Sequence, residues 1–136
     1  HVVLNDQFIY LYVTHHATQA QKQLIIDRWY RHEMSLLLPD LFQHWEKIIG
    51  VRVAQWGIKK MKTRWGSCNT RAHRIWLNLN LIQKNSVCLE YVLVHELVHL
   101  LEASHNQRFY NLMTRFMPQW RHYQALLEGK CTDKIV

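Results

Sequence analysis

Residues 87–101 read VCLEYVLVHELVHLL, and apolar side chains occupy most positions of this segment. A helix that is apolar nearly all round is typical of an element buried in the middle of a fold. Asn85 or Ser86 can cap its start, and we expect the helix to continue to about Ala103. The sequence therefore predicts a domain assembled around one central helix.

Three polar residues interrupt this apolar helix in the motif His95-Glu96-Leu97-Val98-His99. Residues four apart lie one helical turn from each other, so both imidazoles can reach a single zinc ion at about 2.0–2.1 Å. Glu96 would stand beside the metal, where a carboxylate can accept a proton from a water molecule. Buried polar groups need partners, so the alternative to a metal site is a set of hydrogen-bonded core residues.

A catalytic zinc site needs a third protein ligand and one open position. His105 lies six residues beyond His99, which would carry it off the helical face if the helix continued. Ser104 followed by Gln107 has the pattern of a capping box, so we expect a new helix to begin at His105. A break at this point lets the chain turn back and makes His105 the predicted third ligand.

Two glutamates are further candidates near the metal. Glu102 shares a helical face with His95, but three donors along one stripe cannot surround an ion, so Glu102 fits better as a residue that supports the ligands or as a salt-bridge partner. It also stands where the metzincin spacing H-E-x-x-H-x-x-G-x-x-H has glycine, which weakens an assignment to that group. Glu128 is the alternative third ligand, near the end of a helix expected between Pro118 and Gly129.

The residues before the central helix predict a small sheet. Ile75–Leu81 alternates apolar with polar residues and predicts a half-exposed or edge strand, with Asn78 and Asn80 on its polar face. Ile58–Trp65 is a second, lysine-rich strand candidate. The segment Trp65–Cys68 predicts either a loop on the substrate side or a packed tryptophan followed by a tight turn.

A hairpin and a long helical region account for the start of the chain. Val2–Leu4 and Phe8–Val13 predict a short hairpin. A helical period begins at about Gln19, and Pro39 should stop or kink that helix. The helical spacing of apolar residues then resumes and ends at Gly50, which is a plausible C-terminal cap.

The chain has 136 residues, of which 49% are hydrophobic and 20% charged. This balance predicts one ordered domain, residues 1–136, with a core that needs no disulfides. No segment is apolar enough to cross a membrane or has the pattern of a signal peptide, so we expect a cytoplasmic protein. Cys68, Cys88 and Cys131 lack the spacing of a thiolate metal site and predict free thiols.

A formal net charge of +7 indicates an anionic partner and leaves two further functions open. One is a hydrolase of nucleotide phosphoanhydrides, such as a nucleoside triphosphate pyrophosphatase, whose basic side chains would bind phosphate. The other is a nucleic-acid-associated module in which zinc is structural and has four ligands. The simpler interpretation of the basic residues is a solvated strand face. They are Lys59, Lys60, Lys62, Arg64, Arg71 and Arg74.

Four blocks of the sequence together resemble the YgjP-like (DUF45) family of metal-dependent hydrolases, which are relatives of the SprT-like proteases. The helix that contains Trp29 is similar as well. The four blocks are Arg64-Trp65-Gly66-Ser67-Cys68, Ile75-Trp76-Leu77-Asn78, Tyr91 to Leu100, and His105-Asn106-Gln107-Arg108-Phe109.

The resemblance implies an α+β, zincin-like fold, with a small, mostly antiparallel sheet packed against helices and a central metal-binding helix. It implies zinc held by His95, His99 and His105, with Glu96 as catalytic base, and makes a metallopeptidase acting on peptides the leading hypothesis. Strand 75–81 would then pair with an extended peptide. Family members usually carry a longer N-terminal β region, so the chain looks like a short or truncated member. Further candidates for supporting the ligands or touching substrate are Glu102, Arg108, Asn78 and His122.

Overall fold

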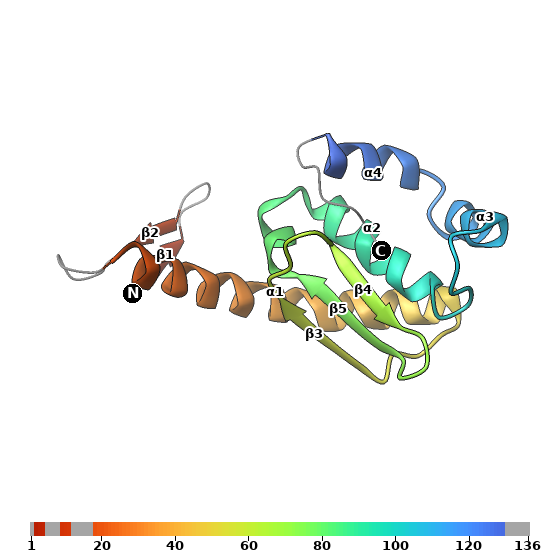
Figure 1. Ribbon diagram of the computed structural model, residues 1–136, viewed down its shortest axis with the longest axis horizontal. Helices are drawn as coiled ribbons and strands as arrows, with labels where there is room; N and C mark the ends of the chain where they lie inside the picture. Colours follow the sequence, from red (N-terminus) through yellow and green to blue (C-terminus); the bar gives the residue numbers. More distant parts are fainter. Residues whose placement is uncertain (1, 5–8, 12–17, 130–136) are drawn as a thin grey trace.

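Helix α2 (Ser86–Val98) lies at the centre of the fold, as its apolar sequence predicts. Every residue from Tyr91 to His99 is buried. The computed structural model describes residues 2–4, 9–11 and 18–129. In it α2 packs against three other helices and against the sheet (Figure 1). This central position explains why the helix is apolar on nearly all sides.

The chain leaves α2 earlier than the sequence predicts. The backbone amides of Leu100 and Leu101 donate to carbonyls three residues back, which tightens the last turn and ends the helix at Val98. A loop then leads to α3 (Gln107–Phe116), which is capped by Asn106. The prediction of a cap at Ser104 is wrong, because the Ser104 backbone amide donates to a glutamate side chain within the loop.

Helix α1 (Gln19–Ile49) is a single helix that carries Pro39 inside it. The side chains of Thr18 and Gln21 form a capping box at its start, and Gly50, with φ 81°, caps its end. The predicted stop at Pro39 does not occur, because one buried stripe on both sides of the proline outweighs the lost hydrogen bond. The stripe consists of Met34, Leu38, Phe42, Trp45 and Ile49.

The described residues beyond α1 form a three-stranded sheet in the order β3-β5-β4. Strand β5 (Arg74–Asn78) pairs in parallel with β3 (Gln55–Lys59) and antiparallel with β4 (Gly66–Asn69). The α+β class is confirmed, but this sheet is mixed and the strand expected at its edge is its central strand. On strand β5, the Trp76 side chain packs against the neighbouring strand, because its indole covers Gly57 and leaves no room there for a Cβ.

Asn78 is fully buried at the end of β5 and does not lie on an exposed face. Its Nδ2 donates to the carbonyls of Met61 and Arg64, at 2.9 and 2.7 Å, and its Oδ1 accepts from the Asn80 amide at 3.0 Å. The Asn78 side chain therefore holds the segment 60–65, together with the Asn78 backbone amide, which donates to the Trp65 carbonyl at 3.0 Å. The predicted strand Ile58–Trp65 is wrong beyond Lys59, and the contacts of Asn78 are structural.

Short elements complete the fold. Strands β1 (Val2–Leu4) and β2 (Ile9–Leu11) pair antiparallel, as the predicted hairpin requires. A 3-10 helix, η1 (Leu79–Gln83), links β5 to α2, and α4 (Trp120–Glu128) lies alongside α2 (Figure 1). None of the helices in the described part of the chain has the length and apolar character needed to cross a bilayer.

Asn78→Ala should destabilise the fold by about 1–3 kcal/mol, because it removes the hydrogen bonds that a fully buried side chain makes to two backbone carbonyls and one backbone amide. Urea unfolding followed by circular dichroism measures this change. Asn80→Ala is the matched control, since it keeps the backbone amide through which Asn80 contacts Asn78. Equal stability of the two variants would contradict the structural assignment of Asn78.

Candidate metal centre

Three histidine rings meet where α2 ends. His95 comes from the last turn of α2, His99 caps the end of that helix, and His105 comes from the loop before α3. The Nε2 atom of His95 lies 3.3 Å from that of His99 and 3.3 Å from that of His105, and the last two lie 3.0 Å apart. Among the described residues this is the only group of three or more potential ligands that converge. These are the three residues that the spacing of the motif and of His105 predicts as ligands.

The distances between these nitrogen atoms match the dimensions of a metal site. Nitrogen ligands about 2.0–2.1 Å from a tetrahedral ion lie about 3.3–3.4 Å from one another. The three imidazoles, at 3.0–3.3 Å, are thus almost at the spacing that an ion requires. Three histidines occupy three tetrahedral positions and leave a fourth for water or substrate, which is the arrangement of catalytic sites.

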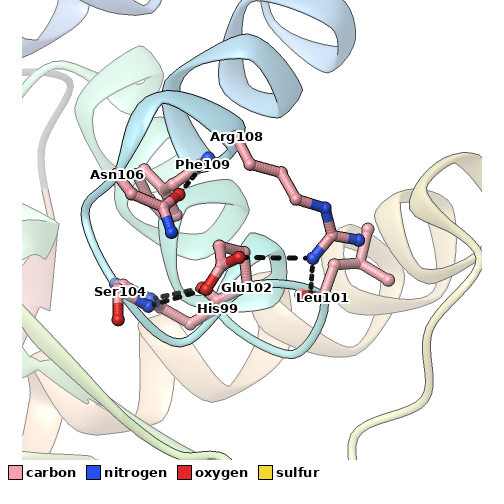
Figure 2. Close-up of polar contacts among 7 residues, drawn as sticks. All are labelled: His99, Leu101, Glu102, Ser104, Asn106, Arg108 and Phe109. Carbon is pink, nitrogen blue, oxygen red and sulfur yellow. Dashed lines mark hydrogen bonds and ion pairs between the residues drawn. The ribbon is translucent and has the colours of Figure 1, made fainter.

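The outer nitrogen of His99 has a protein partner that fixes the ring. Its Nδ1 lies 3.1 Å from the backbone carbonyl of Glu102, which can only accept a hydrogen bond. That contact places the proton on Nδ1 and leaves the Nε2 lone pair for a metal ion. Figure 2 shows the loop around this contact, with Glu102 between His99 and Arg108.

Phe109 forms an aromatic floor beneath the three imidazoles. Its ring centroid lies 4.9 Å from that of His95, 4.6 Å from that of His99 and 5.0 Å from that of His105. The side chain is fully buried. The sequence gives Phe109 no role beyond its place in the block that begins at His105, although its position four residues after His105 is a signal that it can lie under that ring.

Glu96 lies beside this cluster and is completely buried. Neither carboxylate oxygen has a hydrogen-bond partner among the described residues. Burial raises the pKa of Glu96 well above its ordinary value, and the positive charge of Arg64 opposes this shift. A carboxyl group with a raised pKa near a metal centre is suited to accept and return protons.

Gly66 lets β4 approach Glu96 closely. A Cβ added at this position would lie 2.8 Å from Glu96 Oε2 and 2.9 Å from Val92 Cγ1, so any larger residue must displace one of them. The sequence predicts either a substrate-side loop at Trp65–Cys68 or a packed tryptophan followed by a tight turn. Trp65 is buried, as the second interpretation requires, but strand β4 follows it in place of a turn and runs past the carboxylate.

The other candidate residues lie outside the histidine cluster. Glu102 and Arg108 form an ion pair at 3.3 Å beside it. His122 and Glu128 are exposed residues of α4, and neither belongs to the converging group. Asn78 holds the 60–65 segment, as described above, and lies inside the core.

The cysteines give no second reactive centre in the described part of the chain. Cys68 is a free thiol, as predicted, Cys88 is buried in the core, and Cys131 lies outside the described residues. Burial, together with the charge of Glu96, raises the pKa of Cys68 to about 12. A thiol that holds its proton so strongly is a poor nucleophile.

A family model described as "YgjP-like, metallopeptidase domain" matches residues 1–130. The chain belongs to this family. The YgjP-like domain is accordingly a metallopeptidase domain, for which the family implies a metal ion and peptide substrates, and its three converging histidines can hold the ion. The resemblance inferred from the four sequence blocks is thereby confirmed. No curated protein sequence matches the chain significantly.

Two solved structures are similar to the YgjP-like domain in fold. One is the metallopeptidase zymogen of Pyrococcus abyssi abylysin, with a TM-score of 0.67 and 20% identity, over 74% of this chain and 100% of that one. The other is the metallopeptidase zymogen of Methanocaldococcus jannaschii jannalysin, with a TM-score of 0.58 and 19% identity, over 68% of this chain and 94% of that one. These likenesses confirm the predicted zincin-like fold.

Glu96→Gln should stabilise the metal-free YgjP-like domain at neutral pH. Because the folded-state pKa is raised, the contribution of the neutral carboxyl is complete below its ordinary pKa of 4.5 and is lost as pH rises from there towards the folded-state value. The variant keeps a neutral group throughout. Its melting temperature in the presence of a chelator should exceed that of the wild type at about pH 8, and the difference should shrink at about pH 4.

Glu90→Gln is the control for this measurement, because Glu90 lies on the same helix but is only partly buried and accepts a hydrogen bond from Trp45. A stability difference between Glu96→Gln and wild type that does not change with pH would contradict the burial argument.

Gly66→Ala should reduce peptidase turnover by about 100-fold while the metal content stays unchanged, because the nearest atoms to the new Cβ belong to Glu96 and Val92 and not to the histidines. Turnover of a peptide library and metal analysis of the same preparation measure the two effects. Ser67→Ala, in the same strand, is the control. Full activity of Gly66→Ala would show that the close approach of β4 has no bearing on Glu96.

Proposed function

We propose that the YgjP-like domain is a zinc peptidase in which His95, His99 and His105 hold the ion and Glu96 transfers protons. The observation that carries the proposal is the near-tetrahedral spacing of the three Nε2 atoms beside a buried carboxylate that has no hydrogen-bond partner in the described part of the chain. Zinc is the ion that best suits three imidazoles with one open position.

When bound, the zinc ion would polarise the scissile carbonyl and lower the pKa of a water molecule at the open position. Glu96 then accepts a proton from the attacking water and returns it to the leaving amine. Its burial supports this assignment, since a raised pKa lets the same group act as base and then as acid. The Nδ1 contact of His99 with Glu102 keeps that ring facing the site during both steps.

An extended peptide is the substrate that the surrounding sheet favours. Among the described strands, β4 pairs only with β5, so its other edge offers backbone groups for an added strand. This edge includes Gly66, which lies against Glu96. We therefore assign to β4 the peptide-pairing position that the sequence analysis gave to strand 75–81.

Two basic residues that favoured a nucleotide substrate have other contacts. Lys60 pairs with Asp27 at 2.8 Å, and Lys59 Nζ lies 4.7 Å from the centroid of the Trp76 ring. Neither contact involves the histidine cluster. A nucleotide substrate or a nucleic-acid module with structural zinc therefore remains only as an alternative outcome of the experiment below.

The proposal predicts different losses for the base and for a ligand. Glu96→Gln should retain zinc and lose about 10²–10⁴-fold in peptide turnover, because only proton transfer is removed. His105→Ala should lose most of its zinc, because two imidazoles remain. Metal analysis and assays with a peptide library and with nucleoside triphosphates measure both.

Two matched controls accompany these variants. Glu90→Gln makes the same chemical change on the same helix, and His122→Ala removes an exposed histidine from α4. Both should keep zinc and activity. Wild-type protein that binds no zinc, or full turnover by Glu96→Gln, would contradict the proposal. Turnover of nucleotides but not of peptides would favour the phosphoanhydride hydrolase.

A further inference from the structure

The loop between α2 and α3, residues 99–106, makes an unusual return to the metal centre. Its histidine spacing is that of the metzincin pattern, in which glycine occupies the position of Glu102. Glycine suits such a turn because it readily adopts positive φ. Within the described ranges the residues with positive φ are Gly50 and His73, neither of which belongs to this loop. The loop must therefore be held in another way.

Glu102 holds both sides of the turn. Its backbone carbonyl contacts Nδ1 of His99 at 3.1 Å, and its carboxylate accepts a hydrogen bond from the Ser104 amide at 3.2 Å (Figure 2). Ser104 directly precedes His105. One residue thus fixes the ring of the second histidine and the backbone just before the third.

Arg108 completes this arrangement from the first turn of α3. Its NH1 group donates to the Leu101 carbonyl at 2.8 Å and to Glu102 Oε1 at 3.3 Å. The guanidinium therefore joins the beginning of the loop to the carboxylate in its middle, as Figure 2 shows. We call Glu102 and Arg108 together the loop clamp.

The loop clamp should contribute little to the free energy of folding and much more to the position of the histidine ligands. Its ion pair is solvent-accessible, with 61% of the Arg108 side chain and 19% of the Glu102 side chain exposed, and such pairs stabilise a fold only weakly. Metal affinity depends far more steeply on residues that orient the ligands, and their loss typically costs about 10–100-fold.

We propose that Glu102 and Arg108 are positioning residues that place His105 at the metal, in the turn where metzincins use glycine. The inference rests on the proposed zinc site. It gives Arg108 a role in the loop, because the NH1 group of its guanidinium donates to Leu101 and Glu102. Glycine cannot replace Glu102 here, because the turn depends on the carboxylate and not on positive φ.

Zinc affinity and the absorption spectrum of the cobalt-substituted protein test the clamp. Glu102→Ala, Glu102→Gly and Arg108→Ala should each bind zinc about 10–100-fold more weakly in competition with a chelator. Their Co²⁺ spectra should shift towards that of His105→Ala, because the third imidazole is no longer held at the ion. Arg108→Lys keeps the charge and one donor, so it should recover part of the affinity.

Arg115→Ala is the matched control, since Arg115 is an exposed residue of the same helix whose guanidinium lies over Phe116. It should bind zinc and Co²⁺ as the wild type does. Melting temperatures of the metal-free clamp variants should stay close to that of the wild type, which distinguishes positioning from loss of fold. Glu102→Gln, which can still accept from Ser104, provides a milder variant if another fails to fold.

Two results would overturn the inference, and they are distinguishable. Wild-type zinc affinity and Co²⁺ spectra in Glu102→Gly and Arg108→Ala would show that the clamp does not place His105, while leaving the zinc site intact. Failure of the wild type itself to bind zinc would remove the proposed function and the clamp together.

Discussion

Burial of Glu96 constrains much of the remaining structure. Its carboxylate lies out of solvent on a helix whose neighbours form the core, and no described residue bonds to its oxygens. A carboxylate in this position resists ionisation unless a cation lies close. The three imidazoles provide a place for a cation, and Gly66 lets β4 cover the carboxylate. The same packing that completes the core therefore creates a group able to exchange protons.

The parts of the fold that could be predicted from sequence are those encoded by local periodicity and ligand spacing. The central helix, the hairpin and the convergence of His105 with the motif all follow from residues close together in the chain. The order of the strands does not, because alternation along Ile75–Leu81 shows that one face is less apolar without showing which strands lie beside it. Packing of Trp76 over Gly57 supplies that missing information.

Some individual contacts at the metal centre also depend on residues that are distant in the sequence, so local patterns do not predict them. Ser104 has the local pattern of a helix cap, yet Asn106 caps α3 because the Ser104 amide is taken by Glu102. Gly66 and Phe109 belong to the site through contacts across the fold, so no spacing within the motif identifies them. Asn78 differs from the expectation in the opposite direction. The alternating pattern predicts that it faces outwards, but its side chain is buried and donates to two backbone carbonyls of the 60–65 segment.

The three imidazoles all come from the short segment that ends α2 and enters α3. Closing a short chain segment around an ion costs little conformational entropy, and that cost rises only slowly with length. Burial of Glu96, by contrast, needs β4 to be paired and docked on α2. The ligand set is therefore local to one stretch of chain, whereas the environment of Glu96 depends on contacts between elements that are distant in the sequence.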